Sequence, residues 1–402
     1  MKFSVLCLVV FWFCLAQAQP QTPVSQSLLP GGPDKWELVW SDEFDGPDAE
    51  LEGKWKSQNG PSGHIFSSRW RENAVVTNGF LTVALAAGVA SVLPIHAATS
   101  PAGGLLDLAR IRNPVWRPAD NLRDPSVLRV SDGYQLFYSR FVGTNWASPA
   151  SWTIAATFTR DFVRFENDRD VSPKGHASPG DVVKWHGRFI LPYQTYPAAP
   201  TQLCFSESPD LLTWTAPKPF LTEARFLPWN TLRRVIDPTL VIDGDTLHCW
   251  FVGSANVTNA AGKTVRANLL GHAITRDPKL ERWEILSTNA PLLGVSGRAP
   301  DGVENVMIFH TGDHWTMIYS EGLANQHLAL ATSADLLTWQ LGGPIELPRQ
   351  KWMARKYGAP FVWREADQWL MILMGQNAAG RTTFGLLTST DGQRWTLLPE
   401  AP

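Results

Sequence analysis

The sequence predicts an all-β protein: a five-bladed β-propeller that carries a short N-terminal β appendage. A Ser/Thr-x-Asp turn followed by an aromatic residue occurs five times, and an apolar strand precedes each copy. A strand–turn–strand unit rich in aromatic and β-branched residues recurs in phase with it. These units start about 55 to 67 residues apart, as expected for four-stranded blades in a ring, at Asp124, Asp181, Asp237, Glu304 and Ala359. A β-sandwich with Trp-rich strands is the alternative.

The first 18 residues have the features of a secretory signal peptide. Lys2 precedes an apolar run, and Ala16-Gln17-Ala18 follows it as a cleavage site. The run is too short for a spanning helix, and no later stretch reaches membrane length. We therefore expect a secreted or periplasmic monomer without a membrane partner.

The chain divides by composition into further segments. Residues 19–34 are rich in Gln, Pro, Ser and Gly, which suits a flexible lead. Residues 35–84 contain WELVWSDEFDG, LEGKW and NGFLTV, and this short β segment resembles the opening strands of family 16 glycoside hydrolases. That family's Glu-x-Asp-x-x-Glu strand is missing here, so the resemblance carries over no active site. Residues 85–105 are rich in Ala, Gly and Pro and form a linker, and 106–402 form the propeller.

Composition excludes several classes of function. The formal net charge is −2, which argues against nucleic acid as a partner. The chain has 19 Trp; a propeller repeat uses some of them, and sugar-binding proteins stack others on sugar rings. Cys204 and Cys249 lie in different units, and we expect two buried thiols, with a disulfide as the alternative. No CxxC motif, His-rich metal spacing or Gly-rich phosphate loop occurs.

The third repeat shows how each blade begins. Asp237-Pro238 opens it, an apolar strand covers 239–242, and Asp243-Gly244-Asp245 makes the tight turn into a second strand over 246–252. The acids of the Ser/Thr-x-Asp turns are expected to be structural. The last unit ends at 395–398, so an upstream strand from 105–118 or the appendage must close the ring.

The starts of the units also predict a site. In a propeller the innermost strands begin near the central axis, so acids at those starts converge. Like charges held close raise one another's pKa, which sets a proton donor beside an ionised base. Glycoside hydrolysis needs such a pair of carboxyl groups. An Asp before Pro can also simply cap a strand entrance.

Three motifs are similar to the three-carboxylate pattern of glycoside hydrolase family 43 and its five-bladed relatives: Arg123-Asp124-Pro125, Ile236-Asp237-Pro238 and Val303-Glu304-Asn305. The resemblance implies that Asp124 is the general base, that Asp237 orients and tunes the acid, and that Glu304 is the general acid. It also implies an inverting reaction. The family's acid usually lies in Glu-Gly-Pro, from which this chain departs. A retaining family 32-like fructosidase is the lesser reading, because neither of that family's motifs matches well.

Several further residues are expected around the site. Substrate contacts, each of which could instead be a rim ion pair or hydrogen bond, are predicted at Arg123, His176, Asp181, Gln194, Arg355 and Tyr357. No cofactor is implied. Some family 43 members carry a central calcium held through a His, and no position in this sequence matches that His.

The sequence thus predicts a secreted, inverting, exo-acting glycoside hydrolase for oligosaccharides from plant or algal polysaccharides. Arabinofuranosidase, xylosidase and anhydrogalactosidase are the candidate activities. Inserts at 142–151 and 253–268 could close the propeller mouth into a pocket. The alternatives are a non-catalytic carbohydrate-binding propeller and a propeller with a structural or protein-interaction role.

Overall fold

The computed structural model describes residues 74–77, 80–83, 106–116, 118–258 and 262–401. The chain divides into two compact units, residues 1–102 and 103–402. In the first unit, β1 (Ala74–Thr77) pairs antiparallel with β2 (Phe80–Val83). The expected signal peptide, the lead, the linker and most of the segment resembling family 16 lie outside the described residues.

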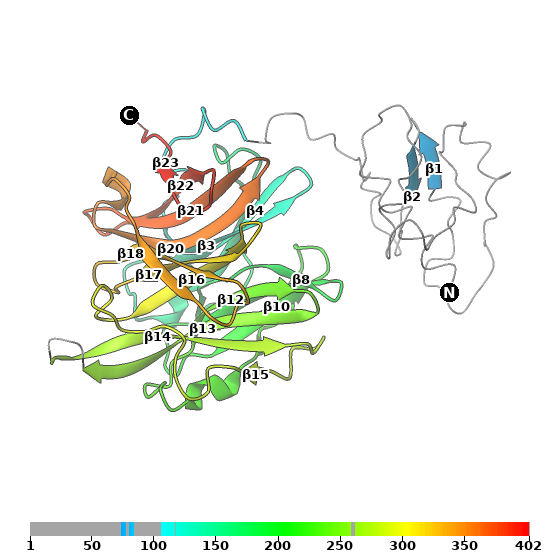
Figure 1. The fold of residues 1–402 in the computed structure, drawn as a ribbon. Helices are drawn as coiled ribbons and strands as arrows, with labels where there is room; N and C mark the ends of the chain where they lie inside the picture. The colour runs from blue at the N-terminus through cyan, green and yellow to red at the C-terminus, as the bar shows by residue number, and fades with distance from the viewer. Residues whose placement is uncertain (1–73, 78–79, 84–105, 117, 259–261, 402) are drawn as a thin grey trace, which may run out of the picture. The chain divides into compact units, whose positions relative to one another are not determined.

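The second unit is a five-bladed propeller, as predicted (Figure 1). Each blade is an antiparallel sheet whose strands follow one another along the chain. The first blade contains β3 (Asn121–Val130), β4 (Gly133–Phe141), β5 (Trp152–Thr159) and β6 (Glu166–Asp170). The second contains β7 (His176–Ala177), β8 (Val183–Trp185), β9 (Arg188–Thr195), β10 (Leu203–Ser208) and β11 (Lys218–Pro219). Its innermost strand is split, because β7 and β8 both pair with β9.

The other three blades have four strands each. The third contains β12 (Ile236–Asp243), β13 (Thr246–Thr258), β14 (Thr264–Thr275) and β15 (Glu284–Ile285). The fourth contains β16 (Val303–His310), β17 (Trp315–Glu321), β18 (His327–Ser333) and β19 (Gln340–Ile345). The fifth contains β20 (Lys356–Glu365), β21 (Gln368–Gln376), β22 (Thr382–Ser389) and β23 (Thr396–Leu397). The helices of the described residues are 3₁₀ turns: η4 (Pro149–Ser151), η5 (Thr222–Phe226) and η6 (Lys351–Met353).

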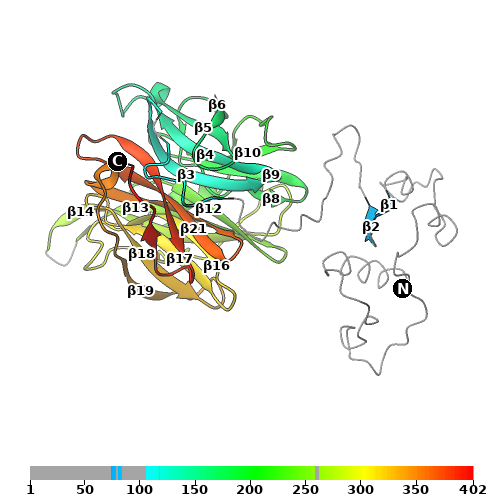
Figure 2. The ribbon, with the colours of Figure 1, turned by 90° about the horizontal axis from the view of Figure 1, so that it is seen from above.

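Apolar packing between neighbouring blades holds the ring together. The inner strands β12, β16, β20 and β3 contact one another in succession, so the fifth blade meets the first (Figure 2). Aromatic residues fill the spaces between blades. Phe162 of the first blade stacks on Trp363 of the fifth at 5.5 Å between ring centroids. Trp214 of the second meets Phe137 of the first at 5.7 Å. Such pairs add to the stability that burial of their area provides.

A segment upstream of the first blade closes the ring, as the sequence predicted. Asn113 is fully buried, and its Nδ2 donates to the carbonyl oxygens of Leu386 and Leu398 at 3.0 and 3.1 Å. Its Oδ1 accepts the backbone N–H of Leu386 at 2.8 Å. Trp116 forms a bridge to Phe384. The start of the propeller is thereby fixed to β22 and to the residues that follow β23.

The Ser/Thr-x-Asp turns are structural, as expected. In the second blade, Asp210 Oδ1 accepts the backbone N–H groups of Leu212 and Thr213 at 2.9 and 2.8 Å. Ser208 Oγ accepts the N–H of Leu211 at 2.8 Å. The carboxylates that cap backbone N–H groups in this way are Asp161, Asp210, Asp277, Asp335 and Asp391.

Cys204 and Cys249 are free, buried thiols, as expected, and burial raises the pKa of Cys204 to about 11.

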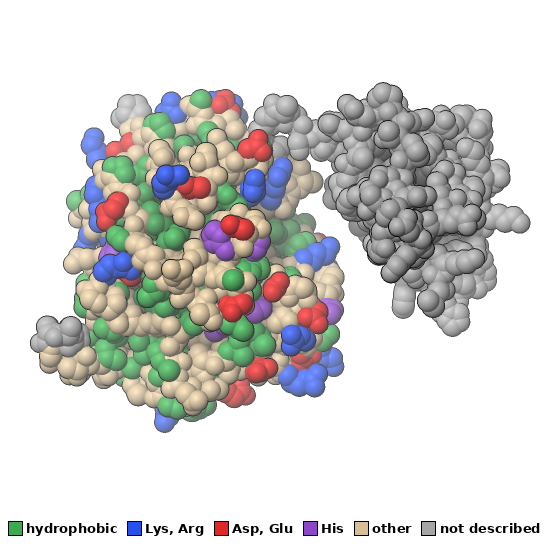
Figure 3. All heavy atoms as spheres, viewed as in Figure 1, with side chains coloured by type: hydrophobic (Ala, Val, Ile, Leu, Met, Phe, Trp, Pro, Cys, Tyr) green, Lys and Arg blue, Asp and Glu red, His purple; other side chains and the backbone are tan. Residues whose placement is uncertain are grey.

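Charges of both signs are interspersed over the face shown in Figure 3. Within the described ranges, no helix is long and apolar enough to cross a membrane.

Candidate active site

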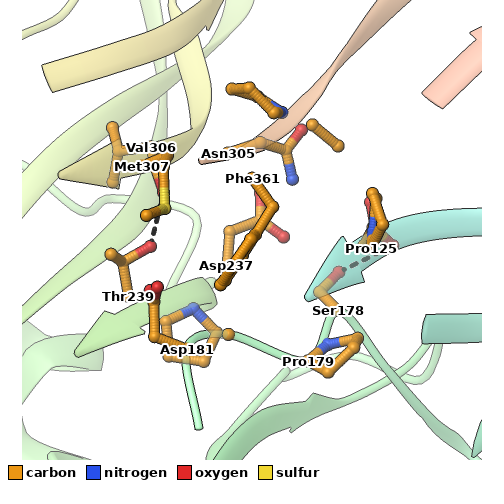
Figure 4. Close-up of a pocket in the computed structure, with 15 residues that line it drawn as sticks. Pro125, Ser178, Pro179, Asp181, Asp237, Thr239, Asn305, Val306, Met307 and Phe361 are labelled. Carbon is orange, nitrogen blue, oxygen red and sulfur yellow. Dashed lines mark hydrogen bonds between the residues drawn. The ribbon is translucent and has the colours of Figure 1, made fainter. Parts of the chain in front are cut away.

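Each blade brings one residue with a left-handed backbone to the propeller axis. These residues have φ angles of 52°, 52°, 51°, 50° and 49°, and they are Asp124, Ser178, Asp237, Asn305 and Ala359. In every blade but the second, the register of the inner strand shifts at this point, which marks a β-bulge. The five residues line one cavity on the axis (Figure 4). The backbone therefore repeats more faithfully than the side chains do.

This geometry corrects two of the predicted blade starts. In the second blade the axial residue is Ser178, and Asp181 lies three residues further along. In the fourth it is Asn305, and Glu304 comes one residue earlier. Glu304 is thus equivalent to Arg123: each precedes the left-handed residue, and their cross-strand partners are Ser320 and Ser139.

The departure from the Glu-Gly-Pro motif has a structural explanation. The residue after Glu304 must adopt φ 50°, a conformation that Gly adopts freely. Asn is among the few other residues that tolerate it well. Asn305 therefore preserves the backbone that positions Glu304.

The axial cavity is too small for a sugar. Its volume is about 30 Å³, which is room for one or two water molecules. Asp181 lines it, and burial raises the pKa of Asp181 to about 7. Asp181 therefore lies on the axis, beside Asp124 and Asp237, which line the same cavity; its contact with substrate stays a prediction.

We define the mouth as the side chains at the start of the inner strands: Arg123, Asp124, Asp237, Glu304 and Lys356. Asp124 is 8% exposed. Its Oδ2 accepts the hydroxyl of Ser139 at 2.8 Å and that of Ser178 at 3.3 Å. These two hydrogen bonds fix the orientation of the Asp124 carboxyl group in the mouth.

Asp237 lies in the most strongly perturbed position of the mouth. Burial, followed by the charges of Glu304 and Asp124, raises the pKa of Asp237 to about 7. Its backbone N–H donates to Gln194 Oε1 at 2.5 Å. Gln194 is 1% exposed, so it anchors the backbone of Asp237. The prediction of Gln194 as a substrate contact is corrected accordingly.

Two buried amides hold Glu304. Asn268 Nδ2 donates to Oε2 at 2.8 Å, and Gln326 Nε2 donates to Oε1 at 2.8 Å. Asn268 is held in turn by the hydroxyl of Ser254 at 2.7 Å. The sequence analysis missed both amides. A polar Asn268 within the apolar run of β14 was the available signal.

Arg123 lies among the carboxylates of the mouth. Burial acts to lower the pKa of Arg123, but Asp124, Tyr196, Glu304 and Asp237 outweigh it and raise that pKa above its ordinary value. Its Nε is buried and has no hydrogen-bond partner among the described residues. The Nε of Arg123 is therefore an unsatisfied donor among the carboxylates of the mouth.

The remaining predicted contacts have different positions. Tyr357 is 3% exposed and donates its hydroxyl to the carbonyl of Ile345 at 3.3 Å, so it is a core residue and the prediction of a sugar contact is wrong. His176 is half-buried, with Nδ1 3.0 Å from the carbonyl of Pro173. Arg355 is exposed beside Lys356, a mouth residue that the sequence analysis missed.

In the part of the chain that the structure describes, no group of three or more His, Cys, Asp or Glu side chains is placed to hold a metal ion. The three carboxylates of the mouth are near enough to interact electrostatically, since the charges of Glu304 and Asp124 contribute to the raised pKa of Asp237.

These features define a five-bladed propeller with three interacting carboxylates at one end of its axis. The chain is similar in structure to a protein described as a glycoside hydrolase, with a TM-score of 0.57 and 14% identity over 70% of this chain and 91% of that one. It is similar to a thermostable family-43 glycoside hydrolase, with a TM-score of 0.55 and 14% identity over 73% and 97% of the two chains. It also resembles the GH43_1 enzyme from Xanthomonas citri complexed with xylotriose, with a TM-score of 0.52 and 13% identity over 73% and 94%.

The likeness to these solved structures confirms the expected fold. No protein-family model and no curated protein matches the sequence.

Proposed function

We propose that this protein is a glycoside hydrolase that inverts the anomeric centre and acts on the ends of oligosaccharides from plant or algal polysaccharides. The grouping of Asp124, Asp237 and Glu304 carries the proposal: burial, followed by the charges of Glu304 and Asp124, raises the pKa of Asp237 to about 7. A proton is thereby kept near neutral pH beside a carboxylate stabilised by two hydroxyl groups. That combination is what the reaction requires.

Each carboxyl group has a role that follows from its surroundings. Asp124 accepts hydrogen bonds from two hydroxyl groups and takes the proton of the attacking water. Glu304, fixed by its two amides, protonates the leaving oxygen. Asp237 keeps its own proton near neutral pH and, as a neighbour of Glu304, orients and tunes the acid. We expect the carboxyl groups of Asp124 and Glu304 to be about 6.5–9.5 Å apart, which leaves room for the water.

Arabinofuranosidase and xylosidase are the activities we propose to test first. The Xanthomonas citri GH43_1 structure holds xylotriose, and a second similar structure is the catalytic domain of a Coprinopsis cinerea GH62 α-L-arabinofuranosidase, with a TM-score of 0.51 and 15% identity over 72% and 95% of the chains. An anhydrogalactosidase remains a third candidate. The proposal includes export, which rests on residues 1–18, and a monomeric state.

A screen of aryl glycosides and of plant and algal oligosaccharides tests the proposal, with the anomer of the first product read by NMR. Glu304→Gln is expected to lower kcat by roughly 10²–10⁴. Glu284→Gln is the matched control, because Glu284 is exposed on β15. Products that retain the anomeric configuration would exclude the inverting mechanism and favour the fructosidase reading.

A specific observation supports a second candidate, a carbohydrate-binding propeller without catalysis. Both oxygens of Glu304 are already occupied by amide N–H groups, an arrangement that also suits a side chain fixed for binding alone. If the wild-type protein binds glycans in the screen and releases no product from any of them, this second function replaces the first.

A further inference from the structure

Cationic side chains without ion-pair partners gather around the mouth. Burial and the charge of Arg123 lower the pKa of Lys356, and Arg355 adds to this effect. Burial and the charge of Arg234 lower the pKa of Arg266. These electrostatic links connect five cations to the three carboxylates: Arg123, Arg234, Arg266, Arg355 and Lys356. Lys356 and Arg266 thus hold their protons less tightly than usual, because burial and the neighbouring cations disfavour their charged forms.

Two other sheltered arginines of the propeller are paired. Arg140, 13% exposed, lies 2.6 Å from Asp170. Arg188, 28% exposed, lies 2.5 Å from Glu207. No carboxylate of the described residues forms a salt bridge with any of the five cations.

The strand geometry places Arg266 beside the general acid. Arg266 and Asn268 alternate with one intervening residue on β14, so their side chains share a face of that strand. Asn268 donates to Glu304 from this face. Arg266 therefore lies on the face of β14 that holds Glu304.

Lys356 has the corresponding position in the fifth blade. Lys356 and Gly358 share a face of β20, because one residue separates them. A Cβ on Gly358 would come within 2.5 Å of Gln326 Cδ, so this face adjoins the second amide that holds Glu304. Strand β20 also contacts β3, which carries Arg123.

Arg266 and Arg355 are exposed, whereas Arg123, Arg234 and Lys356 are half-buried. A half-buried cation without a paired acceptor is unfavourable, and the buried Nε of Arg123 lacks even a neutral acceptor among the described residues. The five cations outnumber the three carboxylates, although the whole chain has a formal net charge of −2. The hydroxyl groups of a neutral sugar would satisfy donors but would leave this charge unbalanced. A carboxylate or a sulfate would satisfy both.

We infer that the mouth accepts an anionic glycan, in which a sugar bound beside Arg123, Arg266 and Lys356 carries a carboxylate or a sulfate ester. This inference rests on the proposed function in that it concerns the same site. It adds the substrate class, namely uronate-containing or sulfated oligosaccharides.

Calorimetric binding to the Glu304→Gln protein tests the inference without turnover. The probes are galacto-oligosaccharides, oligogalacturonates and sulfated galactan oligosaccharides of equal length, together with xylo-oligosaccharides with and without a glucuronate branch. We expect an anionic member to bind at least about tenfold more tightly than its neutral counterpart. The carboxylate and sulfate series identify which anion is preferred.

Charge-removing variants assign the effect to the mouth. Arg266→Gln and Lys356→Gln, each in the Glu304→Gln background, are expected to lower affinity for the anionic ligand roughly tenfold and leave affinity for a neutral ligand unchanged. Arg276→Gln is the matched control, because Arg276 lies at an exposed end of the third blade and pairs with Asp245. Thermal melts establish that each variant is folded.

The outcomes separate this inference from the proposed function. Neutral glycans that bind as tightly as the anionic ones, or no binding by any probe, overturn the inference. Hydrolysis of neutral glycans alone by the wild-type protein also overturns it and supports the proposed function. Tight, charge-dependent binding of an anionic glycan that the wild-type protein never cleaves upholds the inference and overturns the proposed function.

Discussion

Asn268 Nδ2 donates a 2.8 Å hydrogen bond to Glu304 Oε2, and it does so from a neighbouring blade. Because of this bond, a change in the charge of residue 268 acts directly on Glu304. Asn268→Asp replaces the amide by a second carboxylate of the same shape, and a like charge raises the pKa of a carboxyl group. We expect the alkaline limb of the pH–rate profile of kcat/KM to move to higher pH, because the acid keeps its proton longer.

The control for this prediction is Asn167→Asp, since Asn167 is exposed on the outer strand β6 of the first blade. An unchanged alkaline limb in Asn268→Asp, with the variant folded and active, would show that Glu304 does not govern that limb.

Gly358 makes room for the other amide. A Cβ at this position would meet Gln326 Cδ at 2.5 Å and Ser320 Oγ at 2.8 Å. Gly358→Ala should therefore displace Gln326 from Glu304 and lower kcat by about tenfold, the effect of one lost hydrogen bond to a charged group. Steady-state kinetics measure this loss. Gly343→Ala is the matched control, because nothing lies within 4 Å of a Cβ there; equal kinetics for the two variants would contradict the prediction.

Asp237 makes stability depend on pH. The pKa of Asp237 is about 7 in the folded protein, and its ordinary value is 3.8. The folded state therefore binds the proton more tightly than the unfolded state does. The contribution of Asp237 to the free energy of unfolding is thus fully present below about pH 4 and is lost as the pH rises towards 7. Asp237→Asn removes this loss. The variant should be inactive yet more stable than the wild type at pH 8, on the order of 2–4 kcal/mol.

Urea unfolding at pH 4 and pH 8 measures this difference, which should nearly vanish at the lower pH. Asp367→Asn is the control, because Asp367 is exposed in the turn between β20 and β21. A variant that is less stable than the wild type at pH 8 would mean that Asp237 is ionised in the folded protein.

The hydrogen bonds of Asn113, here called the clamp, should contribute to the stability of the closed ring. Asn113→Ala leaves the N–H of Leu386 and two carbonyl groups without their buried partner. We expect a loss of roughly 2–4 kcal/mol in the free energy of unfolding, measured by denaturant titration at constant pH. Asn145→Ala, at an exposed turn that caps only Ala147, should cost far less. Equal losses in the two variants would mean that the clamp does not hold the ring.

Much of the fold was predictable because blades repeat local chemistry. Turns such as Ser208 to Asp210 bond their own backbone, so their signal lies within a few residues. The axial positions were harder to predict. Ser178 and Ala359 adopt left-handed angles that their residue types rarely take, so sequence alone placed Asp181 in phase when Ser178 holds that position.

The acids of the candidate site could be predicted from the sequence. The amide side chains that hold Glu304 could not. Asp124 and Asp237 are marked by the Pro that follows each. Asn268 and Gln326 lie 36 and 22 residues from Glu304 in the sequence, and only the packing of blades brings them to it. Tyr357 was misjudged for the same reason, because burial beside Ile345 depends on the neighbouring blade.

The five left-handed positions on the axis share one backbone conformation, and each can carry a different side chain; we call them sockets. The same main-chain shape supports a carboxylate at Asp124 and Asp237, a hydroxyl at Ser178, an amide at Asn305 and a methyl at Ala359. New chemistry can therefore arise by exchanging a side chain in one socket while the scaffold stays as it is. A propeller of this kind can diversify its reactions around the axis without having to redesign its blades.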